Sequence, residues 1–136
     1  MGDKIGIACI IDDDSVYVNL VKRIIEAKHL CKNLLVFENG KEALSYFEAI
    51  LSNMDEENLP EIIFLDLNMP VMDGWQFLEQ FCGIKNKFGK VITLYIVSSS
   101  INPVDINKAK GIKGVKDYLI KPITIEDLEG IFNASA

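Results

Sequence analysis

The chain has 136 residues, 49% of them hydrophobic and 25% charged, which fits one globular domain with a buried core. Its formal net charge of -6 argues against nonspecific binding to nucleic acid or to an anionic membrane surface, because both need clustered Lys and Arg. No segment approaches the roughly 20 apolar residues that span a bilayer, and the first residues do not resemble a signal peptide. We therefore expect one cytoplasmic domain over residues 1–136, without an output domain, whose partners are proteins or small ions.

The first half of the chain alternates apolar runs with segments of helical periodicity, a pattern typical of strand and helix units around a parallel sheet. A first strand is predicted at about residues 4–11, and Ser15 is predicted to cap the helix that follows it. A second strand at 34–37 leads through Asn39-Gly40 into a second helix. The polar stretch 52–60 is predicted as an exposed connection.

The second half continues with three further strands, each followed by a helix. In chain order these elements are expected at 61–66, 75–82, 91–97, 103–110, 115–120 and from Thr124 to Phe132. Pro103 suits the first turn of its helix, and Gly111 is its expected stop. Five such units predict an α/β fold of three layers, in which helices cover both faces of a five-stranded parallel sheet.

Polar side chains follow four of the predicted strands. Asp12 and Asp13 come after the first strand, Asp66 after the third, Ser98 after the fourth and Lys121 after the fifth. Because parallel strands end at the same rim of a sheet, we expect these side chains to converge there. Three acids on one rim repel one another unless a cation neutralises them, and carboxylate oxygens suit Mg²⁺. The hydroxyl and the ammonium suit phosphoryl oxygens, so the rim is predicted to be a metal and phosphoryl site.

With these residues in place, the chain resembles the response-regulator receiver domain of two-component signalling, over nearly its whole length. The resemblance rests on three motifs in this order and at this spacing: Ile-Ile-Asp-Asp-Asp-Ser from residue 10, Phe-Leu-Asp-Leu-Asn-Met-Pro-Val-Met-Asp-Gly from residue 64, and Asp-Tyr-Leu-Ile-Lys-Pro from residue 117. It implies a flavodoxin-like, doubly wound sheet with strand order 2-1-3-4-5. It also implies a single-domain regulator.

The resemblance assigns the acids their roles. Asp66 is the implied phosphoacceptor, a carboxylate that takes a phosphoryl group from a phosphohistidine and becomes an acyl phosphate. Mg²⁺, or Mn²⁺ as a substitute, is expected to bind Asp13 directly and Asp12 mainly through water. Asp66 and the backbone carbonyl of Asn68 complete the implied metal site. Asn68 and Ser100 occupy the two positions that help to set how readily water attacks the acyl phosphate.

The resemblance also implies how the phosphoryl group is held and sensed. Lys121 offsets its charge, and a cis peptide bond to Pro122 aims the ammonium into the pocket. The Ser98 hydroxyl moves toward the phosphoryl group and vacates space for the Tyr118 ring. This movement is expected to switch the face formed by the fourth helix, the fifth strand and the last helix, where a downstream protein binds.

The implied partners are a histidine kinase or a phosphotransfer protein, with no nucleic acid and no membrane, and the chain is expected not to be a turnover enzyme. Two alternatives stay open. A magnesium-dependent phosphohydrolase with an aspartyl nucleophile needs a second acid two residues later, where this chain has Asn68. A flavodoxin-like cofactor binder needs a phosphate-cradling loop after the first strand, where three acids stand instead.

Overall fold

The computed structural model describes residues 5–69 and 72–135, and its centre is one parallel sheet with strand order β2-β1-β3-β4-β5. All four neighbouring pairs of strands are parallel. In chain order the strands are β1 (Ile5–Ile11), β2 (Cys31–Phe37), β3 (Ile62–Leu65), β4 (Thr93–Ser98) and β5 (Val115–Ile120). The predicted α/β class and strand order are confirmed.

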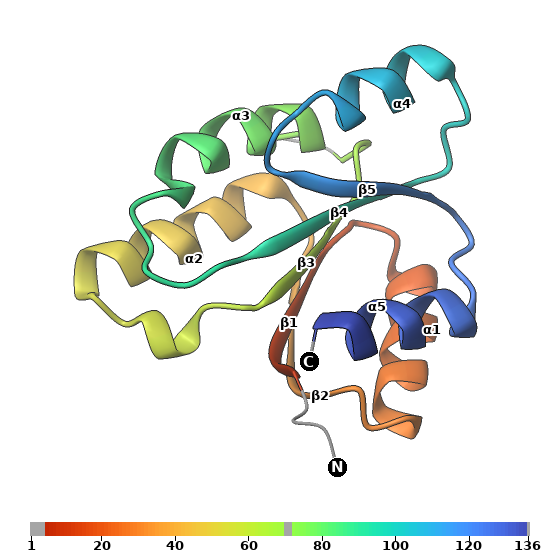
Figure 1. The fold of residues 1–136 in the computed structure, drawn as a ribbon, viewed down its shortest axis with the longest axis horizontal. Helices are drawn as coiled ribbons and strands as arrows, with labels where there is room; N and C mark the ends of the chain where they lie inside the picture. The colour runs from red at the N-terminus through yellow and green to blue at the C-terminus, as the bar shows by residue number, and fades with distance from the viewer. Residues whose placement is uncertain (1–4, 70–71, 136) are drawn as a thin grey trace.

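Five α-helices cover the sheet, with α1 and α5 on one face and α2, α3 and α4 on the other (Figure 1). They are α1 (Ser15–Ala27), α2 (Gly40–Asn53), α3 (Gly74–Lys85), α4 (Pro103–Lys110) and α5 (Ile125–Ser135). The three-layer arrangement is therefore as predicted. Among the described residues, no helix combines the length and the apolar character needed to cross a membrane.

The central strands are buried on both faces, because a helix layer lies on each side of the sheet. Successive side chains of a strand point to opposite faces. Accordingly Cys9 and Ile11 belong to the core cluster under α2 and α3, whereas Ala8 and Ile10 belong to the cluster under α1 and α5. The whole of β3 is buried, so its carboxyl end is held between two packed layers.

Several element ends differ from the prediction. Strand β2 begins at Cys31, three residues earlier than expected, because it is an edge strand whose Lys32 and Asn33 are exposed and break the apolar pattern. Strand β4 begins at Thr93, not at residue 91. The predicted exposed connection contains a short 3-10 helix, η1 (Glu56–Asn58), and the fully buried Leu59. Residue 4 of the first predicted strand, with residues 70 and 71 of the second motif, lies outside the described residues.

The helix starts show which side chain caps each helix. Asp14, not Ser15, is the N-cap of α1, since its carboxylate accepts a hydrogen bond from the Tyr17 backbone N–H at 3.1 Å. A carboxylate also interacts favourably with the positive end of the helix dipole, which favours Asp over Ser at this position. The bounds of α4 and β5 match the predicted ranges.

Candidate functional site

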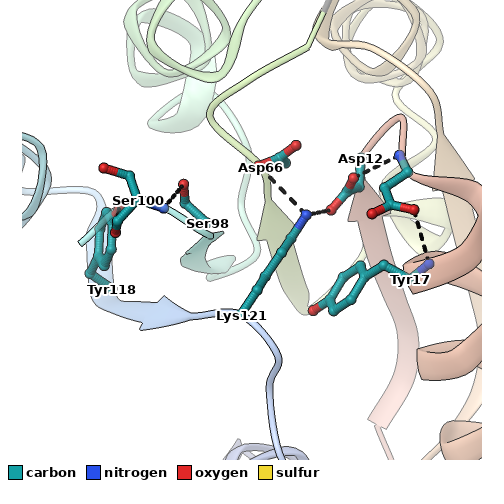
Figure 2. Close-up of polar contacts among 8 residues, drawn as sticks. Asp12, Tyr17, Asp66, Ser98, Ser100, Tyr118 and Lys121 are labelled. Atoms are coloured by element: carbon teal, nitrogen blue, oxygen red, sulfur yellow. Dashed lines mark hydrogen bonds and ion pairs between the residues drawn. The ribbon is translucent and has the colours of Figure 1, made fainter. Parts of the chain in front are cut away.

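The polar side chains predicted to converge lie at the rim where β1, β3, β4 and β5 end. Figure 2 shows four of them, Asp12, Asp66, Ser98 and Lys121. Backbone hydrogen bonds just beyond the strand ends fix the positions of these residues relative to one another. The Asp66 N–H donates to the Ile11 carbonyl at 2.9 Å, and the Lys121 N–H donates to the Ser98 carbonyl at 2.9 Å. The bases of these side chains are therefore held by the sheet itself and not by a loop.

The three consecutive acids after β1 have three different environments. Asp12 is buried, its N–H donates to the Phe37 carbonyl at 2.9 Å, and its Oδ1 accepts from the Asp14 N–H at 2.9 Å. Asp13 is exposed, and Asp14 caps α1. Only two of the three carboxylates are therefore available to a ligand at the rim.

Carboxylate oxygens of Asp12, Asp13 and Asp66 lie within 4.8 Å of one another. Such a group of hard oxygen donors fits Mg²⁺ or Mn²⁺ better than it fits a soft metal. Asn68, which the sequence pattern adds through its backbone carbonyl, is exposed in the loop after β3. The chemistry of this donor set agrees with the predicted divalent cation.

Lys121 brings the positive charge of the site. Its Nζ lies 2.8 Å from Asp12 Oδ2 and 3.8 Å from Asp66 Oδ1, and 4.5 Å from the centre of the Tyr17 ring. The Lys121–Pro122 peptide bond is cis, the isomer that the sequence resemblance implies. The ammonium thus points into the acid cluster, and its shorter contact is with Asp12.

The pKa of the Asp66 carboxyl group is clearly shifted. Burial, together with the neighbouring Asp12 carboxylate, raises its pKa from 3.8 to about 6. The Lys121 ammonium and the backbone N–H groups of Asn68 and Leu67 oppose this rise without cancelling it. The side chain is therefore more basic than an ordinary aspartate, yet still mostly ionised at neutral pH.

Gly74 lets the loop after Asp66 fold back against the end of β3. Its N–H donates to the Leu67 carbonyl at 2.9 Å. A Cβ atom at residue 74 would lie 2.8 Å from the Leu67 Cα and closer still to the Asp66 carbonyl oxygen, so no larger residue fits. Asp73 then caps α3 in a capping box with Gln76. Glycine at this position is thus required by a backbone contact at the site.

The predicted switch residues, Ser98 and Tyr118, are linked through Ser100. The Ser98 hydroxyl is fully buried and accepts from the Ser100 N–H at 3.2 Å. The Tyr118 hydroxyl donates to the Ser100 carbonyl at 2.9 Å. The Ser100 hydroxyl donates to Asp105 in α4 at 2.8 Å. A chain of hydrogen bonds therefore runs from the rim to α4.

Sequence reasoning gave no role to Tyr17 or to Asp105. Tyr17 lies one helical turn beyond Asp13, a spacing that places its side chain over the end of β1, and this was the available signal. For Asp105 the signal was weaker, because an acid in the first turn of a helix is common without any partner. Only the folded loop reveals its contact with Ser100.

A protein-family model described as the response regulator receiver domain matches residues 8–133 of the chain. Among curated proteins, a chemotaxis protein CheY of Listeria monocytogenes is 30% identical over 113 residues, which cover 83% of each chain. A probable methanogenesis regulatory protein, FilR2 of Methanothrix harundinacea, is 28% identical over 90% of this chain and 76% of its own length. Other relatives are longer, and the chain spans 29% of a protein-glutamate methylesterase of Paramagnetospirillum magneticum.

Solved structures show the same fold. A two-component response regulator from Cytophaga hutchinsonii superposes with a TM-score of 0.80 at 28% identity, over 98% of both chains. A manganese-bound form of the response regulator Rcp1 superposes with a TM-score of 0.71 at 21% identity, over 95% of this chain and 90% of the other. At that identity the second likeness concerns the fold alone.

Proposed function

Because this chain belongs to the response regulator receiver domain family and is thus a signalling module of two-component systems, we propose that Asp66 is its phosphoacceptor. The donor is the phosphohistidine of a histidine kinase or of a phosphotransfer protein. The observation that carries this proposal is the convergence of Asp66 with two further acids and one ammonium on a single rim.

The proposed reaction is a displacement at phosphorus. A carboxylate oxygen of Asp66 attacks the phosphoryl group, an acyl phosphate bond forms, and the bond from phosphorus to the histidine nitrogen breaks with its electron pair returning to the imidazole. The raised pKa of Asp66 makes it a stronger nucleophile than an ordinary carboxylate. Lys121, which lies within 4 Å of both buried acids, offsets the repulsion between the incoming phosphoryl oxygens and the rim.

A divalent cation fits the same site. We propose that Asp12, Asp13, Asp66 and the backbone carbonyl of Asn68 hold Mg²⁺, or Mn²⁺ in its place, with Asp13 as a direct ligand and Asp12 acting mainly through water. The burial of Asp12 against Lys121 and the exposure of Asp13 support this division. When bound, the cation supplies positive charge at the phosphoryl oxygens.

We propose that the hydrogen-bond chain from Ser98 to α4 transmits the phosphorylated state. A phosphoryl group on Asp66 offers the Ser98 hydroxyl a charged acceptor, and this hydroxyl then leaves the Ser100 N–H. The Tyr118 ring rotates into the vacated space. The structure describes every residue of α4, and Ala109 is the one among them that is buried. Little packing therefore opposes a shift of this helix.

The surface that responds is proposed to be the face formed by α4, β5 and α5. It exposes apolar side chains suited to a protein partner, namely those of Val104, Ile120 and Ile125. The chain would act there as a cytoplasmic signalling module and not as a turnover enzyme. Ser100 and Asn68 remain the proposed positions that set how fast water removes the phosphoryl group.

Neither alternative has a specific observation in its favour. Asn68 stands where an aspartyl phosphohydrolase needs its second acid, and it is exposed. The loop after β1 presents Asp12 and Asp13, which repel the phosphate of a flavin-type cofactor instead of cradling it.

The experiment that tests the proposal is phosphorylation by a small donor. The purified chain is incubated with acetyl phosphate and Mg²⁺, and its intact mass is followed. We expect one added phosphoryl group in the native chain and none in Asp66→Asn. Asp127→Asn, which changes an exposed carboxylate on α5, is the matched control and should be labelled normally. Undiminished labelling of Asp66→Asn would remove the assignment.

A further inference from the structure

The ammonium of Lys121 lies against the face of an aromatic ring that none of the site assignments uses. Its Nζ is 4.5 Å from the centre of the Tyr17 ring, well within the range of a cation–π contact. Figure 2 shows the ring beside the lysine side chain, on the side away from Ser98. Tyr17 belongs to α1 and Lys121 follows β5, so the contact joins two distant segments of the chain.

The position of the Tyr17 side chain is well fixed by its surroundings. Its backbone N–H is bound by the capping carboxylate of Asp14 at 3.1 Å, and its side chain packs against the core cluster under α1 and α5. The residue is half-buried. Burial, with the nearby carboxylates of Asp12, Asp66 and Asp14, raises the pKa of its phenol, so the ring stays uncharged at physiological pH.

The Lys121 ammonium needs a fixed contact such as this ring because a lysine side chain is flexible. Its four-carbon stem has many rotamers, and a point charge does not fix its own orientation as an arginine fork does. The backbone bond to the Ser98 carbonyl fixes only the base of the side chain. At the tip, Asp12 takes one side of the ammonium, the Tyr17 ring takes another, and the remaining side faces Asp66.

We propose that Tyr17 is a positioning residue for phosphorylation, and this inference rests on the proposed role of Asp66. Its ring face holds the Lys121 ammonium beside the acid cluster, where it meets the incoming phosphoryl group. The face of the ring makes this contact, so the hydroxyl is dispensable and Phe can replace Tyr. A side chain of similar bulk without a ring cannot make this contact.

The contact itself is tested by NMR of the metal-free chain. Protons above the face of an aromatic ring are shifted upfield, so the ε-methylene protons of Lys121 should resonate upfield of the other lysines in the native chain. Tyr17→Phe should keep this shift, and Tyr17→Leu should abolish it. A native spectrum in which the Lys121 protons resonate with those of the exposed lysines would overturn the inference without any variant.

The consequence for the reaction is tested by the rate of phosphorylation with acetyl phosphate and Mg²⁺. Loss of a cation–π contact of a partly desolvated ammonium should slow Tyr17→Leu by about tenfold, whereas Tyr17→Phe stays within about twofold of the native rate. Tyr46→Leu is the matched control, because Tyr46 is also a half-buried helical tyrosine, packed against the other core cluster. It should leave the rate unchanged.

The outcomes separate the possibilities. Equal slowing of Tyr17→Leu and Tyr46→Leu would show a general loss of packing and overturn the inference, as would slow phosphorylation of Tyr17→Phe. If Tyr17→Leu does not fold, Tyr17→Met takes its place with the same expectations. A native chain that shows the Lys121 shift but takes no phosphoryl group would refute the role of Asp66 and with it the role of Tyr17 in the reaction, and would leave the ring contact standing.

Discussion

Lys121 is paired with Asp12 and not with the proposed phosphoacceptor. The two atoms of this pair, Lys121 Nζ and Asp12 Oδ2, are 2.8 Å apart, whereas the ammonium is 3.8 Å from Asp66. Both members are largely buried, which strengthens their attraction relative to a surface pair. The ammonium therefore already neutralises the acid that borders the proposed cation site.

A first prediction follows for the binding of Mg²⁺. Lys121→Met removes a positive charge that competes with a divalent cation for the Asp12 carboxylate, so Mg²⁺ affinity should rise by about tenfold. Isothermal titration calorimetry measures this. Lys108→Met is the matched control, because the Lys108 ammonium lies 4.3 Å from the Trp75 ring and has no contact with these acids in the described structure. Unchanged or weaker binding in Lys121→Met would contradict the competition.

A second prediction concerns stability in the absence of divalent cations. The folded-state pKa of Asp66, about 6, exceeds the ordinary value of 3.8, so the folded chain binds the proton more tightly than the unfolded chain does. The free energy of unfolding should therefore fall as pH rises from about 4 to about 6 and then level off. Since one pKa unit corresponds to ~1.4 kcal/mol, the loss amounts to about 3 kcal/mol.

The variant Asp66→Asn isolates this effect. Without the carboxylate, its unfolding free energy should exceed that of the native chain at pH 7 and approach it at pH 4. Urea unfolding in the presence of a chelator at a series of pH values measures the difference. Asp127→Asn should follow the native curve. If Asp66→Asn were less stable than the native chain at pH 7, this would contradict the expectation that burial of the ionised Asp66 carboxylate lowers the unfolding free energy.

A third prediction compares two glycines of the same helix. Gly74→Ala forces a Cβ against the backbone of Asp66 and Leu67, and should lower the unfolding free energy by about 2 kcal/mol or more. Gly83→Ala, whose added Cβ meets no atom within 4 Å, should instead stabilise α3 by ~0.5–1 kcal/mol. Thermal and chemical unfolding of both variants checks the contrast, and equal effects would count against the close backbone contact.

A fourth prediction concerns the link between the rim and α4. Ser100→Ala removes the hydroxyl that donates to Asp105 and accepts from the Asn102 N–H. Loss of hydrogen bonds worth ~1 kcal/mol should speed amide exchange at Asn102 by about fivefold. Hydrogen exchange followed by NMR measures it. The adjacent, exposed Ser99 provides the control variant Ser99→Ala, and protection that is unaltered in Ser100→Ala would show that this loop is held by other contacts.

Much of the fold was readable from the sequence because the central strands are buried on both faces. The apolar runs that end at Ile11 and Leu65 are typical of strands buried on both faces, and side chains that follow parallel strands are expected to share a rim. The edge strand β2 is longer than the sequence predicted, because it begins three residues earlier. Its first residues have one neighbouring strand and face solvent, so their polarity hides the hydrogen-bonding pattern that makes them part of the sheet.

The sequence predicted which residues meet at the rim. It did not predict which carboxylate pairs with the Lys121 ammonium. That Asp12, Asp66 and Lys121 converge follows from strand order alone. Which carboxylate the ammonium prefers depends on side-chain rotamers and burial, and these are set by packing against Tyr17 and the start of α1. Likewise, which acid of the run caps α1 depends on the residue at which the chain turns into the helix, and neighbouring capping residues do not reveal that.

The most direct test of the central claim is chemical localisation of the phosphoryl group. The native chain is phosphorylated with acetyl phosphate and Mg²⁺, treated with borohydride, which reduces an acyl phosphate to the alcohol, and then digested for peptide mass spectrometry. We expect homoserine at position 66 and at no other aspartate. Homoserine at Asp12 or Asp13, or a phosphoryl group retained on a residue other than Asp66, would contradict the account.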